Sequence, residues 1–225
     1  MNPVDAALRV AVLVSGGGTN LQAIIDAHSR GTLDIEPVLV LSNNAQAYGL
    51  VRARTAGIPA KCVPHASFPD RASFDEAISA QLDTVQADLI LLAGFMRILT
   101  PGFVAKYAGR LLNIHPSLLP LYPGLDTHRR AIEAGDAWHG STVHYVTEKL
   151  DGGPRIIQGR VPVAQDDDAE SLARRVLAVE HEIYPEAVRL IASGRLTCRD
   201  GDAFLDNRKL DEPLQLGEFP TLSAT

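Results

Sequence analysis

The segment LLNIHPSLLP at residues 111–120 contains two side chains that are suited to catalysis. Its apolar residues are typical of a buried strand, and Pro116 prevents that strand from continuing. Asn113 and His115 are two positions apart, so they point to the same side of an extended chain. One donates hydrogen bonds as a neutral amide, and the other titrates near neutral pH. The pair could stabilise a developing negative charge, or it could be a capped strand end with a hydrogen-bonded imidazole.

A third candidate is Asp151, which stands before two glycines in the sequence KLDGGP. A carboxylate beside His115 would orient the imidazole and stabilise its positive charge, while the amide of Asn113 donates to an oxyanion. Open α/β sheets place their reactions at the carboxyl ends of strands, where Asn113 and His115 are expected. The alternative for Asp151 is an ordinary Asp-Gly turn between two strands.

The glycine turn SGGGTN at residues 15–20 is typical of an anion site, because it joins an expected strand to an expected helix. Glycines let the backbone approach a phosphate closely, and Thr19 supplies a hydroxyl. The dinucleotide pattern GxGxxG fails, since Leu21 stands where the third glycine belongs, and no lysine follows for a nucleoside triphosphate. A single phosphate monoester is therefore the predicted ligand, and a glycine turn without a ligand is the alternative.

Serine and metal chemistry are competing interpretations of the polar residues. Ser117 and Ser141 lie near histidines in the sequence, but no GxSxG elbow is present and Ser117 follows a proline. The seven histidines include no HExxH motif and no cluster with cysteines, so we expect no metal site. His144 alternates with apolar neighbours and either lines the cleft or packs in the core. His181 is interpreted as a histidine on a helix face.

Apolar, β-rich runs alternate with helical patterns along most of the chain. Strands are predicted at residues 8–15, 37–42, 60–65, 87–94, 111–115, 141–146 and 155–163. A long helix with an apolar stripe is predicted from about residue 167 to 192. The alternation predicts an α/β fold with a doubly wound, mostly parallel sheet and helices on both faces. We expect one domain over residues 1–205, with a hairpin after Gly194, and a mobile C-terminal tail over residues 206–225.

Composition limits the class of protein and its partners. The chain of 225 residues is long enough for one sizeable core, and its 46% hydrophobic and 21% charged residues are ordinary for a globular domain. A formal net charge of −6, without a basic cluster, argues against nucleic acid as a partner. Cys62 and Cys198 form no CxxC pair, which favours a reduced compartment. Because neither a signal-peptide pattern nor a membrane-spanning apolar run is present, we expect a cytoplasmic protein without a membrane partner.

Four segments together resemble the phosphoribosylglycinamide formyltransferases, which are folate-dependent enzymes of purine biosynthesis. In chain order they are SGGGTNLQAI, LAGFMRIL, LLNIHPSLLP and LDGGP, and the resemblance covers roughly residues 8–205. NIHPSLLP and AGFMRIL are typical of the wider superfamily that uses formyltetrahydrofolate. The SGGGTN turn and the compact length favour this family over methionyl-tRNA formyltransferase, which carries a further C-terminal domain.

The resemblance implies that 10-formyltetrahydrofolate, as a co-substrate and without a metal, gives its formyl group to the amine of glycinamide ribonucleotide. It assigns stabilisation of a tetrahedral intermediate to Asn113 and His115, and support of proton transfer to Asp151. The implied substrate contacts are the 5′-phosphate with Gly18, Thr19 and Asn20, the ribonucleotide with Glu180, the folate pteridine with Met96, Arg97, Ile98, Leu99 and Asn113, and the folate glutamate tail with Arg71.

Two alternatives remain open. A formyltetrahydrofolate deformylase would use the same Asn, His and Asp side chains to release formate, and it usually carries an extra N-terminal regulatory domain. A non-catalytic folate-binding module would keep the MRIL segment and would have no use for Asp151. The expected partners are small-molecule substrates alone, and the expected state is a monomer or a homodimer.

Overall fold

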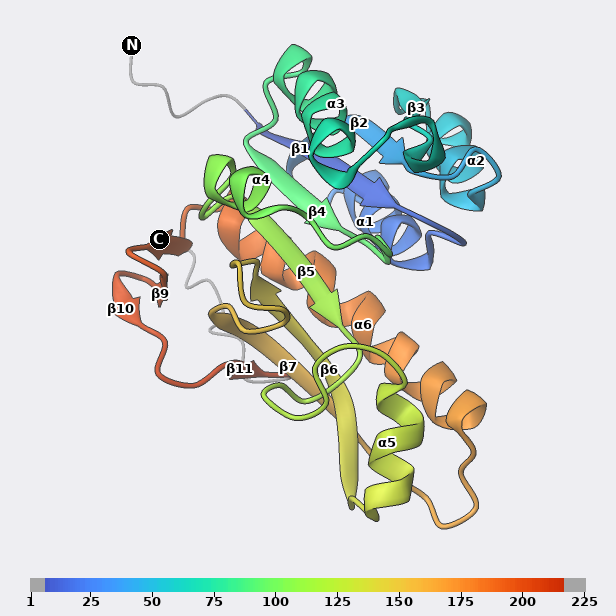
Figure 1. The fold of residues 1–225 in the computed structure, drawn as a ribbon. Helices are drawn as coiled ribbons and strands as arrows, with labels where there is room; N and C mark the ends of the chain where they lie inside the picture. The colour runs from blue at the N-terminus through green and yellow to red at the C-terminus, as the bar shows by residue number, and fades with distance from the viewer. Residues whose placement is uncertain (1–6, 217–225) are drawn as a thin grey trace.

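An eight-stranded sheet forms the centre of the molecule (Figure 1). The computed structural model describes residues 7–216. Across the sheet the strand order is β11-β7-β6-β5-β4-β1-β2-β3. The strands are β1 (Leu8–Val14), β2 (Ile35–Ser42), β3 (Ala60–Cys62), β4 (Leu89–Leu92), β5 (Leu111–His115), β6 (Trp138–Tyr145), β7 (Arg155–Pro162) and β11 (Leu214–Gln215). Strands β1 to β5 are mutually parallel and β6 is antiparallel to its neighbours, which confirms the predicted, mostly parallel sheet.

Helices cover both faces of the sheet, as the doubly wound prediction requires (Figure 1). One core packs α1, α2 and α6 against the sheet, and a second core packs α3 and α4 against the opposite face. Val12 of β1 belongs to the first core and Leu13 to the second, so this strand is apolar on both faces. The helices are α1 (Thr19–Ser29), α2 (Tyr48–Thr55), α3 (Arg71–Thr84), α4 (Pro101–Lys106), α5 (Thr127–Ala134) and α6 (Ala169–Ala192), with a 3₁₀ helix, η1 (His65–Ser67).

The largest differences from the expected strand ends, at β3 and β6, have local reasons. β3 ends at Cys62, earlier than expected, because Pro64 has no N–H to donate and a 3₁₀ turn follows it. β6 begins at Trp138, earlier than expected, and includes Gly140. Glycine is typical of loops, but a Cβ on Gly140 would lie 2.0 Å from the carbonyl oxygen of Gly159 in β7. Glycine is therefore required there for the two strands to approach.

The longest helix, α6, carries the predicted apolar stripe and one buried acid. The stripe packs in the first core and consists of Leu172, Val176, Val179 and Ile183. A capping box fixes the start of the helix, because Asp168 and Ser171 each accept a hydrogen bond from the backbone N–H of the other. Glu180 lies on the buried face as well, so the helix directs a carboxylate toward the interior.

A small antiparallel sheet follows α6 and contains the predicted hairpin. Its strands are β8 (Leu196–Arg199), β9 (Asp202–Leu205) and β10 (Arg208–Lys209), in the order β10-β9-β8. Part of the expected tail is paired, since β10 bonds to β9 and β11 bonds in parallel to β7. The expected mobile tail also includes residues 217–225, which lie outside the described residues. The mobility of the tail therefore stays a prediction.

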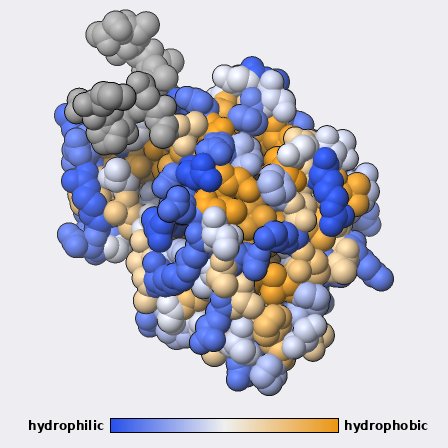
Figure 2. All heavy atoms as spheres, turned by 90° about the horizontal axis from the view of Figure 1, so that it is seen from above, coloured by the Kyte–Doolittle hydropathy of each residue, from blue (hydrophilic) through white to orange (hydrophobic). Residues whose placement is uncertain are grey.

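The surface is mixed in polarity, and some of its apolar side chains lie near the end of β5. Figure 2 shows hydrophobic residues that reach the surface between hydrophilic ones on the face seen from above. Large exposed hydrophobic side chains in the loops that follow β4, β5 and β6 include Met96, Ile98, Leu121, Leu125 and Leu150. Within residues 7–216, no helix is long and apolar enough to cross a membrane.

Candidate active site

Asn113 and His115 lie at the carboxyl end of β5, at the edge where the parallel strands β4 and β1 also end. His115 is buried, with 6% of its surface exposed. Its Nε2 atom lies 2.9 Å from the carbonyl oxygen of Tyr122, which can only accept, so the Nε2–H group donates. Its Nδ1 atom lies 3.5 Å from Oδ2 of Asp151. The structure therefore brings together the histidine and the aspartate that the sequence pairs.

Asp151 reaches His115 from the loop between β6 and β7. This loop passes so close to β6 that a Cβ on Gly153 would lie 1.9 Å from the carbonyl oxygen of Tyr145. Asp151 itself adopts the left-handed region, with a φ of 49°. Its side chain is 8% exposed, and Oδ2 accepts a hydrogen bond from the backbone N–H of Gly124 at 2.8 Å. From the sequence, Asp151 was expected either to form an Asp-Gly turn or to place a carboxylate beside His115. In the structure it does both.

Asn113 contacts His144, the histidine whose position the sequence left open. The two residues are cross-strand partners in β5 and β6. Nδ2 of Asn113 lies 3.3 Å from Nε2 of His144, and this Nε2 lies 3.8 Å from Oδ1 of Asp151. His144 is 2% exposed, so it packs in the interior and also lines the site. We call Asn113, His115, His144 and Asp151 the polar cluster.

Ser117 and Ser141 hold the backbone around the polar cluster. Both residues are fully buried. Oγ of Ser117 donates to the carbonyl oxygen of Leu121 at 2.6 Å, and Oγ of Ser141 donates to the carbonyl oxygen of His115 at 2.8 Å. Because each hydroxyl proton is used on a backbone carbonyl, neither serine is placed to attack a substrate. The serine-nucleophile interpretation has no support in this geometry.

The predicted phosphate turn joins β1 to α1 and is anchored on α2. Gly18 has a φ of 68°, and a Cβ at this position would lie 2.7 Å from Cα of Gly49. Nε–H of Arg52 donates to the carbonyl oxygen of Gly17 at 2.8 Å. In the described part of the chain, no side chain caps α1. The first N–H groups of this helix, beginning at Thr19, are therefore available to an anion.

A cavity of about 360 Å³ adjoins this turn along α1 and includes Thr19, Gln22, Arg52 and His181. Nε2 of His181 is buried and has no hydrogen-bond partner between residues 7 and 216. Burial lowers the pKa of His181. The expected helix-face histidine therefore faces a groove between α6 and α1 rather than open solvent.

Glu180 connects the phosphate turn with β6. It is 7% exposed, and burial raises its pKa. Nδ2 of Asn20 donates to Oε2 of Glu180 at 2.7 Å, and Oγ of Ser141 lies 3.2 Å from Oε1. Oδ1 of Asn20 is buried and unpartnered within the described residues. Glu180 thus orients Asn20, while its expected contact with the ribonucleotide stays a prediction.

The expected folate segment, residues 96–99, follows β4 at the same edge of the sheet. Met96 is 69% exposed and Ile98 is 62% exposed, so both could contact a ligand. The N–H of Met96 donates to Oγ of Ser15 at 2.8 Å, which ties the segment to the end of β1. Arg97 is exposed, whereas Leu99 packs against the second core.

Arg71 stands apart from the other predicted residues. It begins α3 and is exposed. No hydrogen bond or ion pair in the described part of the chain joins it to the polar cluster or to residues 96–99. The helix itself is linked to the residue that follows that segment, because the N–H of Thr100 donates to Oδ2 of Asp75 at 2.6 Å. Contact between Arg71 and a folate tail stays a prediction.

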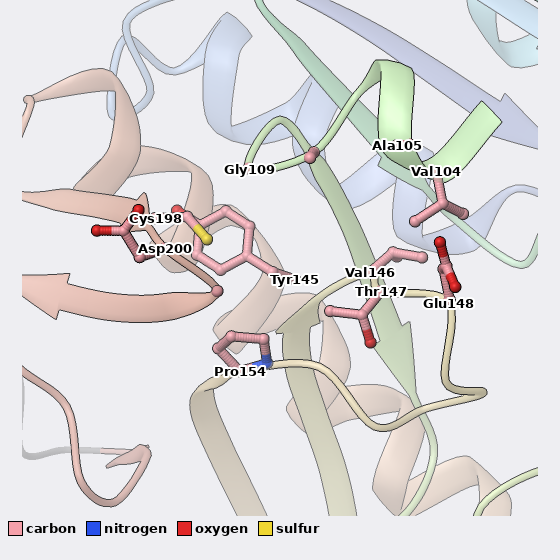
Figure 3. A pocket seen from close by; sticks show the side chains of 12 residues that line it. Val104, Ala105, Gly109, Tyr145, Val146, Thr147, Glu148, Pro154, Cys198 and Asp200 are labelled. Atoms are coloured by element: carbon pink, nitrogen blue, oxygen red, sulfur yellow. The ribbon is translucent and has the colours of Figure 1, made fainter. Parts of the chain in front are cut away.

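A separate cavity of about 380 Å³ contains none of the predicted site residues (Figure 3). Gly109, Tyr145, Glu148 and Cys198 are among the residues that line it. Tyr145 is the cross-strand partner of Leu112, near the start of β5, whereas His115 ends that strand. This cavity therefore lies toward the opposite end of β5 from His115.

A pair of histidines supports the loop that contacts His115. Nε2 of His139 lies 3.1 Å from Nδ1 of His128, and the ring of His139 packs edge-on against Tyr122. His139 is 1% exposed. Burial, with a smaller contribution from His128, lowers the pKa of His139 to about 4. The folded protein thus holds a neutral imidazole beside the site.

We expect the free energy of unfolding to decrease as the pH is lowered from about 6.5 to about 4. In this range the folded state keeps His139 neutral and the unfolded chain protonates it, so the unfolded state binds more protons. The decrease due to His139 is at most about 3 kcal/mol. Chemical denaturation at several pH values measures it. A His139→Asn variant should show a shallower slope, and equal slopes in the two proteins would contradict the assignment.

Comparison with known proteins assigns the chain to a family. The family model described as formyl transferase matches residues 8–188. The matched segment runs from β1 into α6 and contains the phosphate turn, the folate segment and the polar cluster. Because the match spans most of the chain, the chain belongs to the formyl transferases.

Comparison with individual relatives identifies one family among the formyl transferases. The chain is 49% identical to the phosphoribosylglycinamide formyltransferase of Escherichia coli K12, over 90% of this chain and 96% of that protein. It is 50% identical, over 84% of its length, to a part comprising 14% of the trifunctional purine biosynthetic protein adenosine-3 of Drosophila pseudoobscura pseudoobscura. The structure of the Coxiella burnetii phosphoribosylglycinamide formyltransferase superposes with a TM-score of 0.88 at 49% identity, covering 92% of this chain and 99% of that one. The chain belongs to the phosphoribosylglycinamide formyltransferase family.

The fold is shared with the alternative hydrolase as well. A formyltetrahydrofolate deformylase from Pseudomonas syringae has a TM-score of 0.82 at 29% identity, and the match covers 90% of this chain but 67% of that one. The lower identity and the unmatched third of the deformylase separate it from the relatives above.

Proposed function

We propose that this chain transfers the formyl group of 10-formyltetrahydrofolate to the amine of glycinamide ribonucleotide, as a step of purine biosynthesis. The observation that carries the proposal is that the polar cluster lies at the same sheet edge as the glycine turn at residues 15–20. A phosphorylated amine held at the turn and a folate held on residues 96–99 would meet at the end of β5.

The reaction itself requires one new C–N bond and two proton movements. The amine nitrogen attacks the formyl carbon, and the electron pair of the C=O bond moves onto oxygen. The resulting tetrahedral intermediate collapses as the bond to the folate nitrogen N10 breaks. The amine loses one proton and N10 gains one, so the protons balance.

The polar cluster supplies groups for both the oxyanion and the protons. Asn113 donates an N–H to the oxyanion, and protonated His115 adds a positive charge beside it. Asp151 orients His115 and supports proton transfer through water. The 3.5 Å contact between His115 Nδ1 and Asp151 Oδ2 and the bond from the N–H of Gly124 to Asp151 support these roles.

The substrates occupy separate elements in this proposal. The 5′-phosphate binds the backbone of Gly18, Thr19 and Asn20, where α1 begins without a side-chain cap among residues 7–216. Glu180 supports binding of the ribonucleotide by accepting a hydrogen bond from Asn20, which orients the Asn20 side chain. The pteridine contacts residues 96–99 and Asn113, with the exposed Met96 and Ile98 as apolar contacts. The glutamate tail of folate forms an ion pair with Arg71, the exposed cation at the start of α3, in this proposal.

An assay of formyl transfer with and without glycinamide ribonucleotide tests the proposal. We expect the formylated ribonucleotide to form at the rate at which tetrahydrofolate appears, and little formate to be released when the ribonucleotide is omitted. Formate released at an equal rate without the ribonucleotide would identify a deformylase. Binding of the folate without any turnover would identify a folate-binding module.

We expect formyl transfer to survive exhaustive chelation, with kcat changed by less than about twofold. Charge in the transition state is stabilised by Asn113 and His115 in this proposal, so no Lewis acid is required. The measurement compares kcat before and after dialysis against a strong chelator. Activity that is lost on chelation and restored by zinc or another divalent ion would overturn the metal-free mechanism.

We further propose a cytoplasmic protein whose partners are small molecules, with neither nucleic acid nor membrane among them, acting as a monomer or homodimer. The net charge of −6 and the absence of a basic cluster in the sequence argue against nucleic acid as a partner. Sedimentation of the purified protein over a range of concentrations measures its oligomeric state, and a mass above that of a dimer would contradict it.

A further inference from the structure

His144 is the member of the polar cluster to which no catalytic role has been given. It lies on β6 opposite Asn113 and is 2% exposed. Three groups surround its ring: the carbonyl oxygen of Tyr145, the amide of Asn113 and the carboxylate of Asp151. Each of these groups constrains where the imidazole can carry a proton.

The carbonyl of Tyr145 determines the tautomer of His144. Nδ1 lies 2.9 Å from this carbonyl oxygen, which can only accept a hydrogen bond, so Nδ1 carries the proton. Burial lowers the pKa of His144; the carbonyl of Tyr145 and then Asp151 act in the opposite direction, and His115 makes a small further contribution to the lowering. The ring is therefore neutral near pH 7 and its Nε2 atom presents a lone pair.

The lone pair of Nε2 in turn determines the orientation of the Asn113 amide. Nδ2 of Asn113, 3.3 Å away, can donate to it. If the amide were rotated by half a turn, Oδ1 would face the same lone pair, and two acceptors would oppose each other. One N–H of Asn113 is thus directed at His144. The same nitrogen retains a second N–H, because a primary amide has two.

We propose that His144 is a positioning residue that fixes the Asn113 amide with its nitrogen, rather than its oxygen, directed into the reaction site. An amide oxygen and an amide nitrogen are similar in size, so packing alone distinguishes the two orientations poorly. With the oxygen inward, Asn113 would repel the oxyanion that it is meant to stabilise. The inference about catalysis rests on the proposed role of Asn113, but the assignment of the tautomer does not.

The contact with Asp151 defines the competing arrangement. Its Oδ1 atom lies 3.8 Å from Nε2 of His144, which is longer than a hydrogen bond. Moving the proton to Nε2 would favour Asp151 but would leave Nδ1 without a proton against the carbonyl of Tyr145. That tautomer would also deprive Asn113 of its acceptor.

Nitrogen-15 NMR of the imidazoles tests the tautomer without reference to the reaction. We expect His144 to show a protonated Nδ1 and an unprotonated Nε2 near pH 7. A protonated Nε2, or a charged ring at neutral pH, would overturn the proposal.

Kinetics of two variants at His144 separate positioning from packing. Leucine at this position fills the space but accepts no hydrogen bond, whereas the side-chain oxygen of glutamine can accept one from Asn113. We expect His144→Leu to lower kcat by about 10- to 100-fold with both KM values within about twofold, and His144→Gln to retain more activity. Equal losses in the two variants, with unchanged unfolding free energies, would show a packing role and contradict the proposal.

A double-mutant cycle with Asn113→Ala completes the test. If His144 acts through Asn113, adding His144→Leu to Asn113→Ala should change kcat by less than about twofold. Additive losses would overturn the proposal, as would a His144→Leu variant with unchanged kcat in a protein where Asn113→Ala is impaired. A negligible effect of Asn113→Ala alone would instead contradict the proposed catalytic role of Asn113, and the NMR result would still decide the tautomer.

Discussion

Replacement of Asp151 with asparagine is expected to lower kcat by at least about 100-fold and to leave both KM values within about twofold. The amide keeps the size of the carboxylate and can still accept the hydrogen bond from the N–H of Gly124. It removes the negative charge 3.5 Å from Nδ1 of His115, and with it the group proposed to support proton transfer. Steady-state kinetics with each substrate varied in turn measures the change.

A matched control for this variant is Asp126→Asn, in the loop after β5. Asp126 shares the left-handed backbone of Asp151, with a φ of 57°, but its side chain is 63% exposed and pairs with Arg129. Its replacement should change kcat by less than about twofold, since it lies outside the polar cluster. A similar loss in both variants, or a loss at Asp151 that appears in KM alone, would contradict the role proposed for Asp151.

Local sequence signals were sufficient for the strand-helix alternation and for the strand end at His115. The apolar runs of β1 and β4 are continuous because both strands are buried on two faces, and such runs are visible without a structure. Pro116 and the two glycines after Asp151 likewise mark chain reversals by their own chemistry. These signals depend on neighbours in the sequence, so they could be read there.

The structural features that could not be predicted from the sequence depend on contacts between segments that are distant in the chain. The carbonyl of Tyr122 that binds His115 belongs to a loop, and any residue type would present the same backbone group. His144 was visible as an alternating strand residue, but its place beside Asn113 depends on the register of β5 and β6. The pairing of β11 with β7 joins segments far apart in the chain, and its two residues carry too weak a pattern to predict it.

The buried acid of α6 shows why an ordinary sequence feature can be important in the structure. Glu180 resembles an exposed helix acid in sequence, yet it is buried and bonded to Asn20. Through Ser141 it also adjoins the carbonyl of His115. The glycine turn, through Asn20, and the end of β5, at His115, are therefore joined by one chain of polar contacts. Such a relation would keep the bound amine aligned with the polar cluster.

Replacement of Gly18 with valine is expected to raise the KM for glycinamide ribonucleotide at least about 10-fold and the KM for the folate by less than about twofold. Gly18 has a φ of 68°, which β-branched residues strongly disfavour, and a Cβ there would lie 2.7 Å from Cα of Gly49. The turn would have to move away from α2, and the N–H groups at the start of α1 would no longer converge on a phosphate. Steady-state kinetics with each substrate varied in turn measures both KM values.

The neighbouring Gly17 provides the matched control, because a Cβ there would meet nothing within 4 Å and its φ is not positive. Gly17→Ala should leave both KM values within about twofold. This control distinguishes an effect of distorting the turn at Gly18 from an effect of replacing any glycine in it. The free energy of unfolding of each variant must be measured as well, since strain at Gly18 destabilises the fold by roughly 1–2 kcal/mol. If Gly18→Val raises both KM values equally in a folded protein, the turn is not the phosphate site. The phosphate would then have to be sought elsewhere, beginning with the groove beside Arg52 and His181.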